Sequence, residues 1–339
     1  MEIKLQQSID EKYYSSNSNY NIASFSLVHT LPLVSVGITT FRRPRTLKQT
    51  LNSVISQTYK NLEIIISNDD MNDIKTKNII KQFLKTDSRI KYISNKIKLG
   101  STLNQLSVLK HSCGKYFMWL NDDDWIDKNY IEDCLFTITS NPDLILVCGK
   151  TRFYQDNIFA YNGRAINILS KDSRKRLLTF YTQQLGSGNS PNFGIILKEE
   201  LEKISVKNIL GWDNILFSNI AYKGKIKTLD TIYIHRRLNG ESKSLRDIAL
   251  ELNRNPLERV FPHLFLWRNI FMDICFNSRI FKSTSTFSRF FIGIKLTLIL
   301  LFNLPKYYSI YKMRKGTIKR NYHLEKIATS VYLSEVKVQ

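Results

Sequence analysis

The sequence predicts an α/β protein with a mostly parallel sheet flanked by helices and a helical extension at its C-terminal end. Short runs of β-branched and other apolar residues alternate with amphipathic segments between Leu33 and Cys148. This alternation is typical of strand–helix–strand units with parallel strands. Apolar residues make up 43% of the 339 residues, which is enough for a core. The low counts of glycine (13) and proline (7) exclude collagen-like and low-complexity chains.

Five short apolar runs are predicted to be strands, because the buried strands of parallel sheets are almost continuously apolar. They are Leu33–Thr39, Leu62–Ser67, Ile90–Ser94, Tyr116–Leu120 and Leu144–Cys148. A helix is predicted to begin at Pro44, where the missing N–H has no helical partner to lose. Further helices are predicted at Asp73–Lys85, Leu103–His111 and Ile126–Ser140.

The second half of the chain has a weaker pattern. It contains a turn-rich loop at Gly186–Asn192, a predicted helix at Trp212–Tyr222 and the end of a strand at Ile232–His235. The loop has two glycines in a G-x-G spacing but lacks the third and does not follow the first strand. We therefore do not interpret it as a dinucleotide-binding loop.

Three regions are predicted along the chain. Residues 1–32 form an irregular leader without the basic start, apolar core and cleavage site of a secretory signal. Residues 33–245 form the main domain, divided into halves at 33–125 and 126–245. Residues 246–339 form a basic, apolar helical region. The four cysteines show no CxxC pair or metal-ligand spacing, which favours a reducing, cytoplasmic location.

The chain is strongly basic, with 50 Lys+Arg against 29 Asp+Glu and a net charge of +21. Such a charge implies an anionic partner: nucleic acid, an acidic membrane surface or a phosphorylated substrate. Residues 274–324 contribute ten basic and no acidic residues. The apolar run Phe290–Leu304 inside them is too short to span a bilayer. We expect either an interfacial helix on anionic headgroups or a packed helical hairpin with a solvated basic face.

Three adjacent carboxylates, Asp122, Asp123 and Asp124, follow the fourth predicted strand. In parallel sheets, ligands bind beyond the carboxyl ends of the strands. Three neighbouring carboxylates repel one another, and a hard divalent cation such as Mg²⁺ or Mn²⁺ is the usual remedy. The alternative is a solvated turn before a helix, where acidic residues are also favourable.

Four motifs in this order resemble the inverting family 2 glycosyltransferases, which have the GT-A fold. They are VSVGITTFRRP, EIIISNDDMND, KLGSTLNQ and GKYFMWLNDDDW, and the resemblance extends from Leu33 to Ser244. It implies a Rossmann-like sheet, a nucleotide-sugar donor and Mg²⁺ or Mn²⁺ held by a DXD-type motif. The Pro-Thr-Tyr-Asn-like turn of the family is replaced here by Thr39-Thr40-Phe41-Arg42.

The resemblance also implies roles for individual residues. The donor nucleotide would contact Thr39, Thr40, Phe41, Arg42, Asp69, Asn104 and, near the ribose, Asp122. The metal would be bound by Asp123, supported by Asp124, with His235 as a further candidate. Asp213, in the context Gly-Trp-Asp before a helix, would be the catalytic base. Asn189 and Asn192 would contact the acceptor. For Asp213 alone, a helix cap is the alternative.

The leading hypothesis is therefore transfer of a hexosyl or N-acetylhexosaminyl group from a nucleotide-sugar donor. We expect this donor to be a UDP-sugar. The acceptor would be a saccharide or an undecaprenyl-linked saccharide of bacterial surface polysaccharide, such as O-antigen, capsule or lipopolysaccharide. The basic residues 274–324 would hold the enzyme at the inner face of the cytoplasmic membrane. The alternatives are a nucleic-acid-binding protein, for which we see no motif, and a catalytically silent protein that binds sugar nucleotides.

Overall fold

The computed structural model describes residues 31–155, 157–184, 190–238 and 245–299. The predicted leader, 1–32, thus falls almost wholly outside the described residues. In the described part, a nine-stranded sheet has the order β3-β2-β1-β4-β8-β6-β9-β5, with β7 paired to β6. The strands are β1 Val34–Thr40, β2 Leu62–Asn68, β3 Ile90–Ser94, β4 Tyr116–Asn121, β5 Trp125–Ile126, β6 Leu144–Gln155, β7 Ile158–Asn162, β8 Ile195–Leu197 and β9 Lys225–Arg237.

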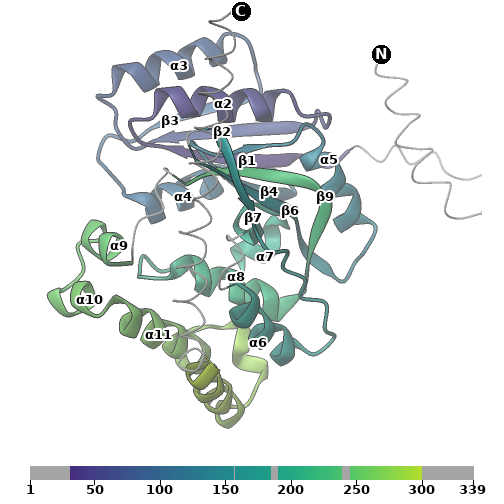
Figure 1. Ribbon diagram of the computed structural model, residues 1–339, viewed down its shortest axis with the longest axis vertical. Helices are drawn as coiled ribbons and strands as arrows, with labels where there is room; N and C mark the ends of the chain where they lie inside the picture. The colour runs from purple at the N-terminus through teal and green to yellow at the C-terminus, as the bar shows by residue number, and fades with distance from the viewer. Residues whose placement is uncertain (1–30, 156, 185–189, 239–244, 300–339) are drawn as a thin grey trace, which may run out of the picture. The chain divides into compact units, whose positions relative to one another are not determined.

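The first half of the sheet is parallel, as the sequence predicts. β1 pairs with both β2 and β4, and β2 pairs with β3, all in parallel. Helices α2 (Pro44–Ile55) and α3 (Ile74–Leu84) lie on one face, and α4 (Ser101–Lys110) lies on the other (Figure 1). Helix α4 approaches β1 closely because Gly37 has no side chain: an added Cβ would lie 2.6 Å from Val108. The expected α/β architecture with a mostly parallel, helix-flanked sheet is confirmed.

The second half joins this sheet through mixed pairings. β6 runs parallel to β9, whereas β8 is antiparallel to both β4 and β6, and β7 is antiparallel to β6. The helices here are α5 Tyr130–Thr139, α6 Ser173–Gln184, α7 Lys198–Glu202 and α8 Trp212–Lys223. Residues 190–193 form a single 3₁₀ turn, η1 (Ser190–Phe193).

Two predicted boundaries are wrong, both because of strand pairing. The helix expected from Ile126 begins only at Tyr130, because Trp125 and Ile126 form the short strand β5. Trp125 pairs with His235 and Ile126 with Ile234 on β9. Pairing with a distant strand thus decides the structure of Trp125 and Ile126, although the local sequence pattern predicts a helix from Ile126. The same ladder formation extends β6 seven residues beyond the predicted end at Cys148, to Gln155.

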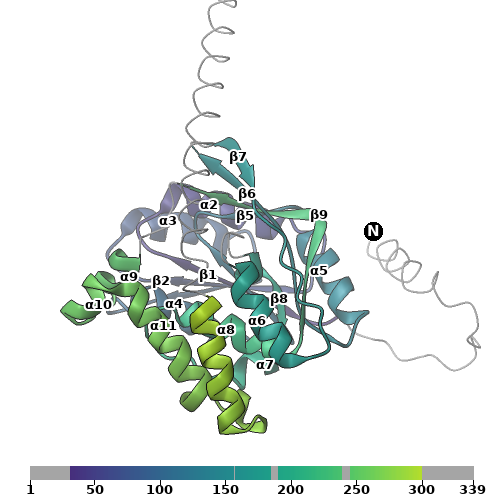
Figure 2. The ribbon, with the colours of Figure 1, turned by 60° about the horizontal axis from the view of Figure 1, so that its bottom comes forward.

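The C-terminal part is helical and folds back on itself. Helices α9 (Leu245–Glu251), α10 (Pro256–Val260) and α11 (Pro262–Met272) lead through short turns to a helix over 286–299. That helix lies beside α11 (Figure 2), where Gly293 permits close contact with Phe271. Up to residue 299 the helices thus pack as a hairpin, one of the two arrangements considered, and whether this region binds a membrane stays a hypothesis. The rest of the run Phe290–Leu304 lies outside the described residues. No helix within the described ranges is long and apolar enough to cross a bilayer.

The hairpin is attached to α8 by polar contacts. The Asn219 side chain donates to the Asp273 carboxylate at 2.8 Å and accepts from the Ser278 hydroxyl at 2.6 Å. Farther along, the Tyr222 and Thr284 hydroxyls lie 2.6 Å apart. Burial raises the pKa of Asp273 to about 6, although the Asn219 hydrogen bond and the charge of Lys207 act in the opposite direction.

We predict that Asp273→Asn stabilises the protein at neutral pH. The raised pKa means that the folded state binds a proton more tightly than the unfolded state between pH 3.8 and about 6. Wild-type stability should therefore fall as pH rises through this window. The variant lacks this loss and should be more stable by about 1–3 kcal/mol at pH 8, with a smaller difference at pH 4. Urea unfolding at pH 4 and pH 8 measures this difference in the free energy of unfolding, with the exposed Asp230→Asn as the control. The prediction would be contradicted if the stability of Asp273→Asn fell with pH as steeply as that of the wild type.

Candidate active site

A cleft of about 370 Å³ opens at the carboxyl edge of the parallel strands. The register explains its position, because Thr40 lies beside Asn68 on β2 and Thr39 beside Asn121 on β4. The turns after β1, β2 and β4 therefore meet at one place. The cleft is lined by nine of the predicted site residues: Thr39, Thr40, Phe41, Asp69, Asn104, Asp122, Asp123, Asn192 and Asp213. The predicted residues Arg42, Asp124 and His235 do not line it, and Asn189 lies outside the described residues.

The turn after β1 is fixed to the acidic turn after β4. The Phe41 backbone N–H donates to Asp122 Oδ2 at 3.3 Å. The Phe41 ring lies under two cations, with Arg42 5.1 Å and Lys98 4.5 Å from its centroid. Arg42 has a φ of +56°, which directs its side chain to Asp70, 2.6 Å away. Arg42 thus lines a neighbouring cavity of about 340 Å³ together with Asp69 and Lys98.

Asp69 anchors the loop before α4. Its two carboxylate oxygens accept the backbone N–H groups of Leu99 at 2.7 Å and Gly100 at 2.8 Å. Asn95 connects Asp69 to Asn104, since its amide donates to both at 3.3 and 3.1 Å. Asp69 and Asn104, both predicted as donor contacts, therefore lie close together in the lining of the cleft.

The acidic turn is balanced by arginines. Arg43 Nη1 lies 2.8 Å from Asp123 Oδ2 and 3.5 Å from Asp122 Oδ1. Asp124 accepts from Asn121 at 3.2 Å and from Arg236 at 3.3 Å. Burial raises the pKa of Asp124 to about 7; Arg236 opposes this rise and Asp123 adds to it.

This geometry changes the expected metal ligands. Asp124 is 2% exposed and does not line the cleft, so Asp122 and Asp123 form the pair of carboxylates there. Among the described residues, no group of three or more His, Cys, Asp or Glu side chains is arranged so that it could hold a metal ion. Mg²⁺ and Mn²⁺ are commonly held by one or two carboxylates, with substrate phosphates and water completing the shell. The donor set of Asp122 and Asp123 fits this pattern.

His235 has a different environment from the one predicted. Its Nε2 lies 2.7 Å from Asp127 Oδ1 and its Nδ1 lies 3.0 Å from the Tyr154 hydroxyl. The ring stacks on Trp125, its partner in the β5–β9 ladder, at 5.1 Å between centroids. Because both nitrogens have protein partners and the ring lies outside the cleft lining, the geometry favours a structural role for His235 instead of a metal contact.

Asp213 lies in the first turn of α8, and Gly211 precedes that helix as its cap residue. Asp213 is therefore not the N-cap. Gly211 has a φ of +79°, and a Cβ there would lie 2.0 Å from Leu266 Cδ1, so this turn requires glycine. Burial raises the pKa of Asp213, opposed by hydrogen bonds from its own and the Asn214 backbone and from the side chain of Asn192. A partly buried carboxylate with a raised pKa is a stronger base than an exposed one.

Several lining residues are absent from the sequence prediction of the site. They are Lys98, Ser101, Gln105, Trp119, Asn121, Phe193, Ile248 and Glu251. Arg43, which follows β1, and Arg236 and Arg237, the last two residues of β9, also line the cleft, and their positions at strand ends give a signal in the sequence. Ile248 and Glu251 come from α9, whose local pattern does not reveal that the helix reaches the cleft.

The helix-flanked, mostly parallel sheet with a cleft at its carboxyl edge has the GT-A type of fold. The model of the family described as "Glycosyl transferase family 2" matches residues 35–204, and the chain belongs to this family. The crystal structure of S. aureus TarS 1-349 superimposes with a TM-score of 0.50 at 16% identity, covering 87% of this chain and 91% of that one. This likeness concerns the fold.

Two relatives are similar in sequence over shorter segments. An uncharacterized glycosyltransferase of Haemophilus influenzae is 38% identical over 114 residues, 33% of this chain and 35% of that protein. A GalNAc(5)-diNAcBac-PP-undecaprenol beta-1,3-glucosyltransferase of Campylobacter jejuni is 37% identical over 95 residues, 28% of this chain and 30% of that protein. The match thus spans about a third of the length of these two relatives.

We predict that Asp69→Asn weakens nucleotide binding through the loop at Leu99 and Gly100. An amide offers one acceptor oxygen where the carboxylate offers two, so one backbone N–H would face an NH₂ group. The loss of one charge-assisted hydrogen bond should lower the free energy of unfolding by about 1–3 kcal/mol. Thermal unfolding and UDP titration measure both effects. The control is Asp70→Asn, whose carboxylate pairs with Arg42 and accepts from the Asn72 N–H but does not line the cleft. Equal UDP affinity in Asp69→Asn and wild type would be inconsistent with this role.

Proposed function

We propose that the protein is an inverting glycosyltransferase that uses a nucleotide-sugar donor, a UDP-sugar in our hypothesis, and transfers a hexosyl or N-acetylhexosaminyl group. One observation carries the proposal: a single cleft is lined both by the carboxylate pair Asp122 and Asp123 and by the separate, partly buried carboxylate Asp213. Family membership supports a sugar-transfer reaction.

In the proposed reaction, Asp213 accepts the proton of an acceptor hydroxyl while that oxygen attacks the anomeric carbon. The bond between this carbon and the diphosphate oxygen breaks, and the nucleoside diphosphate leaves with the electron pair. Attack from the side opposite the leaving group inverts the configuration. Asn192 holds Asp213 through a side-chain hydrogen bond and so orients the carboxylate.

We assign the donor to other residues of the same lining. Phe41, Asp69 and Asn104 line the cleft and would contact the nucleotide. Asp122 and Asp123 would hold Mg²⁺ or Mn²⁺, which when bound supplies positive charge next to the departing diphosphate. Arg236 and Arg237 also line the cleft and offer guanidinium groups to phosphate oxygens.

For the acceptor, we propose a saccharide carried on an undecaprenyl-type lipid, as in the synthesis of O-antigen, capsule or lipopolysaccharide. The support is the Campylobacter jejuni relative, whose name describes an undecaprenol-linked acceptor. Such an acceptor lies in a membrane, so the enzyme would act at the inner face of the cytoplasmic membrane.

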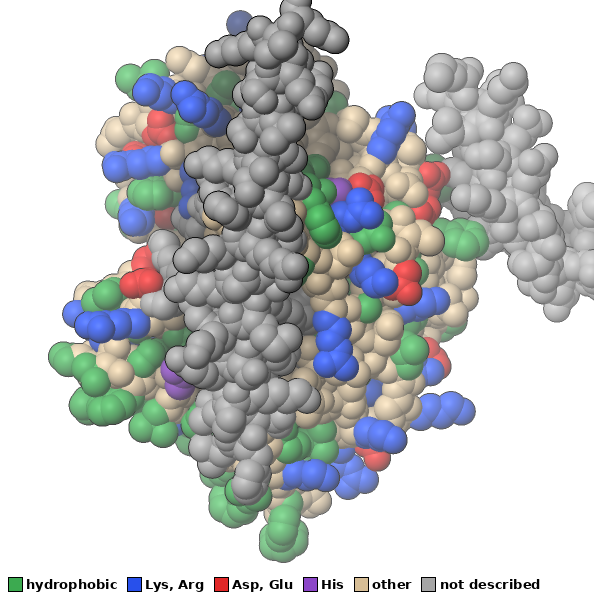
Figure 3. Space-filling model, in the orientation of Figure 1, with side chains coloured by type: hydrophobic (Ala, Val, Ile, Leu, Met, Phe, Trp, Pro, Cys, Tyr) green, Lys and Arg blue, Asp and Glu red, His purple; other side chains and the backbone are tan. Residues whose placement is uncertain are grey.

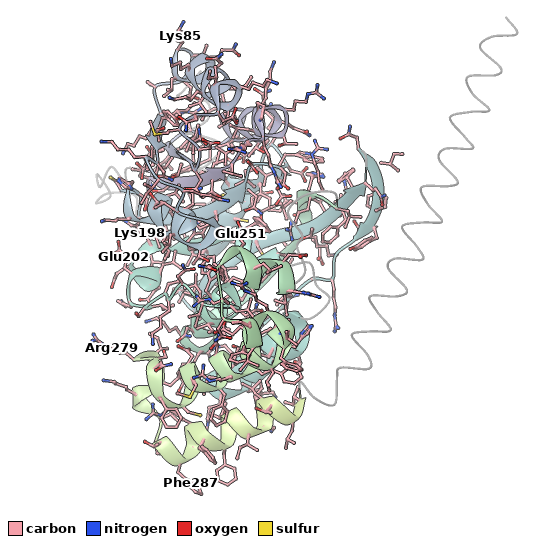
Figure 4. All side chains as sticks on the ribbon, turned by 90° about the vertical axis from the view of Figure 1, so that its left-hand side faces the viewer. Lys85, Lys198, Glu202, Glu251, Arg279 and Phe287 are labelled. Atoms are coloured by element: carbon pink, nitrogen blue, oxygen red, sulfur yellow. The ribbon has the colours of Figure 1, made fainter. Side chains whose placement is uncertain are left out.

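The C-terminal helices offer a surface suited to an anionic membrane. Large apolar side chains are exposed there, among them Phe287 (73%), Phe291 (56%), Leu257 (62%) and Val260 (63%). Figure 3 shows hydrophobic side chains gathered near α10, and Figure 4 shows Phe287 projecting at the end of the molecule opposite Lys85. Arg289 and Lys295 lie on the same helix as Phe287. Apolar side chains beside cations are typical of helices that bind anionic interfaces.

We predict that Asp123→Ala and Asp213→Ala fail at different steps. With UDP-, GDP- and dTDP-sugars, Mn²⁺ and a lipid-linked acceptor, Asp123→Ala should lose metal-dependent donor binding. Asp213→Ala should bind donor normally and lose about 10²–10⁴-fold in transfer rate, the usual contribution of a general base. Nucleotide release and donor titration measure the two steps.

The control for these variants is Asp143→Ala, since that carboxylate is 72% exposed and pairs with Lys225 at 2.6 Å, outside the cleft lining. If Asp123→Ala and Asp213→Ala both transfer sugar at the wild-type rate, the site assignment is wrong. Salt-sensitive, sequence-tolerant DNA binding without sugar transfer would favour the nucleic-acid alternative. If the wild type binds donor and metal but transfers no sugar, the alternative of a catalytically silent sugar-nucleotide-binding protein would be favoured.

We predict that replacing Phe287 and Phe291 together by Ser weakens binding to phosphatidylglycerol vesicles. Removing two exposed rings takes away apolar area that would enter the interface, so the bound fraction should fall at least several-fold. Vesicle sedimentation at low and high salt, with neutral phosphatidylcholine vesicles alongside, measures this. Ile74→Ser, at an equally exposed site on α3, is the control. Equal sedimentation of all three proteins would rule out this surface.

A further inference from the structure

Arg43 occupies an unusual place between the turn after β1 and the acidic turn after β4. Its backbone is held at the start of α2, where Pro44 follows and the Arg43 carbonyl accepts from the Leu47 N–H at 3.1 Å. Its side chain extends into the cleft lining and reaches both Asp122 and Asp123. The backbone of Arg43 is thus fixed by the helix, while its guanidinium lies on the two carboxylates that fit a divalent cation.

The charges explain why something cationic lies there. Asp122 and Asp123 are adjacent in sequence and only 5% and 7% exposed, so water screens their repulsion poorly. The guanidinium makes a 2.8 Å contact with one carboxylate and a 3.5 Å contact with the other. A divalent cation bound to the same oxygens would lie close to this positive group. The two cations therefore compete for one pair of carboxylates.

The alternative partner for Arg43 is the donor itself. A guanidinium prefers the paired oxygens of carboxylates and phosphates, and it can exchange one for the other. The cleft that contains Arg43 also contains the residues proposed for the nucleotide, among them Phe41 and Asn104. A diphosphate in this cleft would offer Arg43 new hydrogen-bond acceptors. Arg43 could then leave the carboxylates of Asp122 and Asp123, and the metal could bind them.

We propose that Arg43 is a displaceable counter-ion that makes metal binding depend on the nucleotide diphosphate. Before the donor binds, Arg43 neutralises Asp122 and Asp123 and keeps their affinity for Mn²⁺ or Mg²⁺ low. When the diphosphate binds, Arg43 moves to its oxygens and releases the carboxylates to the metal. The inference rests on the proposed function, because it assumes that a nucleoside diphosphate enters this cleft.

The test measures Mn²⁺ affinity directly. Titration followed by the electron paramagnetic resonance signal of free Mn²⁺ is done with and without UDP. In the wild type, UDP should tighten Mn²⁺ binding by about tenfold or more, within the usual range of coupling between two sites. Arg43→Gln should bind Mn²⁺ alone about tenfold more tightly than the wild type. UDP should tighten Mn²⁺ binding less in this variant than in the wild type, because only direct coordination by the phosphate oxygens remains. By linkage, Mn²⁺ should then tighten UDP binding less in the variant.

Two further variants make the result specific. Arg45→Gln removes the same charge from an exposed site two residues away and should behave as the wild type. Arg43→Lys keeps the charge and should keep Mn²⁺ binding weak without UDP. If Arg43→Gln is unstable, as melting curves would show, Arg43→Met, which keeps most of the side-chain bulk and removes the charge, takes its place with the same expected result.

Equal Mn²⁺ affinity of Arg43→Gln and wild type without UDP, or weaker binding by the variant, overturns the inference. The same holds if UDP leaves wild-type Mn²⁺ affinity unchanged. These outcomes are separate from the fate of the proposed function: sugar transfer by the wild type with unaltered Mn²⁺ binding in Arg43→Gln refutes only the counter-ion role. Absence of transfer with every nucleotide-sugar refutes the proposed function, whatever the Mn²⁺ titrations show.

Discussion

The parallel pairing of β1 with β2 on one side and with β4 on the other is the constraint on which the site depends. This register places Thr40 beside Asn68 and Thr39 beside Asn121. Turns that are about 30 and 80 residues apart in the chain are thereby brought to one edge. The buried apolar faces of these strands fix the register, since a slip of one residue would turn core side chains toward the wrong face. The cleft is a consequence of how the core packs.

Charge compensation is the second condition. A carboxylate-rich turn with little solvent contact needs cations, and the chain provides them from two places: Arg43 after β1 and Arg236 at the end of β9. Each arginine is brought to the acidic turn by a strand that pairs within the same sheet. Part of the net charge of +21 therefore serves to compensate the carboxylates of this turn. The ten basic residues of 274–324 suit the anionic membrane surface that we propose as the partner of the C-terminal region.

Much of the parallel half was predictable because its elements are local and periodic. The strand Ile90–Ser94 was predicted with its observed bounds, and Pro44 marks the observed start of α2. The environment of His235 was not predictable, because it depends on β5, a two-residue strand defined only by its distant partner. Likewise, Asn121 and Arg236 donate to Asp124 and keep it out of the cleft lining, which leaves Asp122 and Asp123 there. Such contacts leave no periodic trace in the sequence.

Helix α8 serves two regions at once. Its first turn carries Asp213, and the side chains of Asn219 and Tyr222 farther along hold the C-terminal hairpin through Asp273 and Thr284. A rigid helix transmits a displacement at one end to the other with little loss. The orientation of the carboxylate in the cleft and the seating of the exposed apolar helices are thus mechanically linked. Sequence changes that adapt one of them to a new environment are constrained by the other.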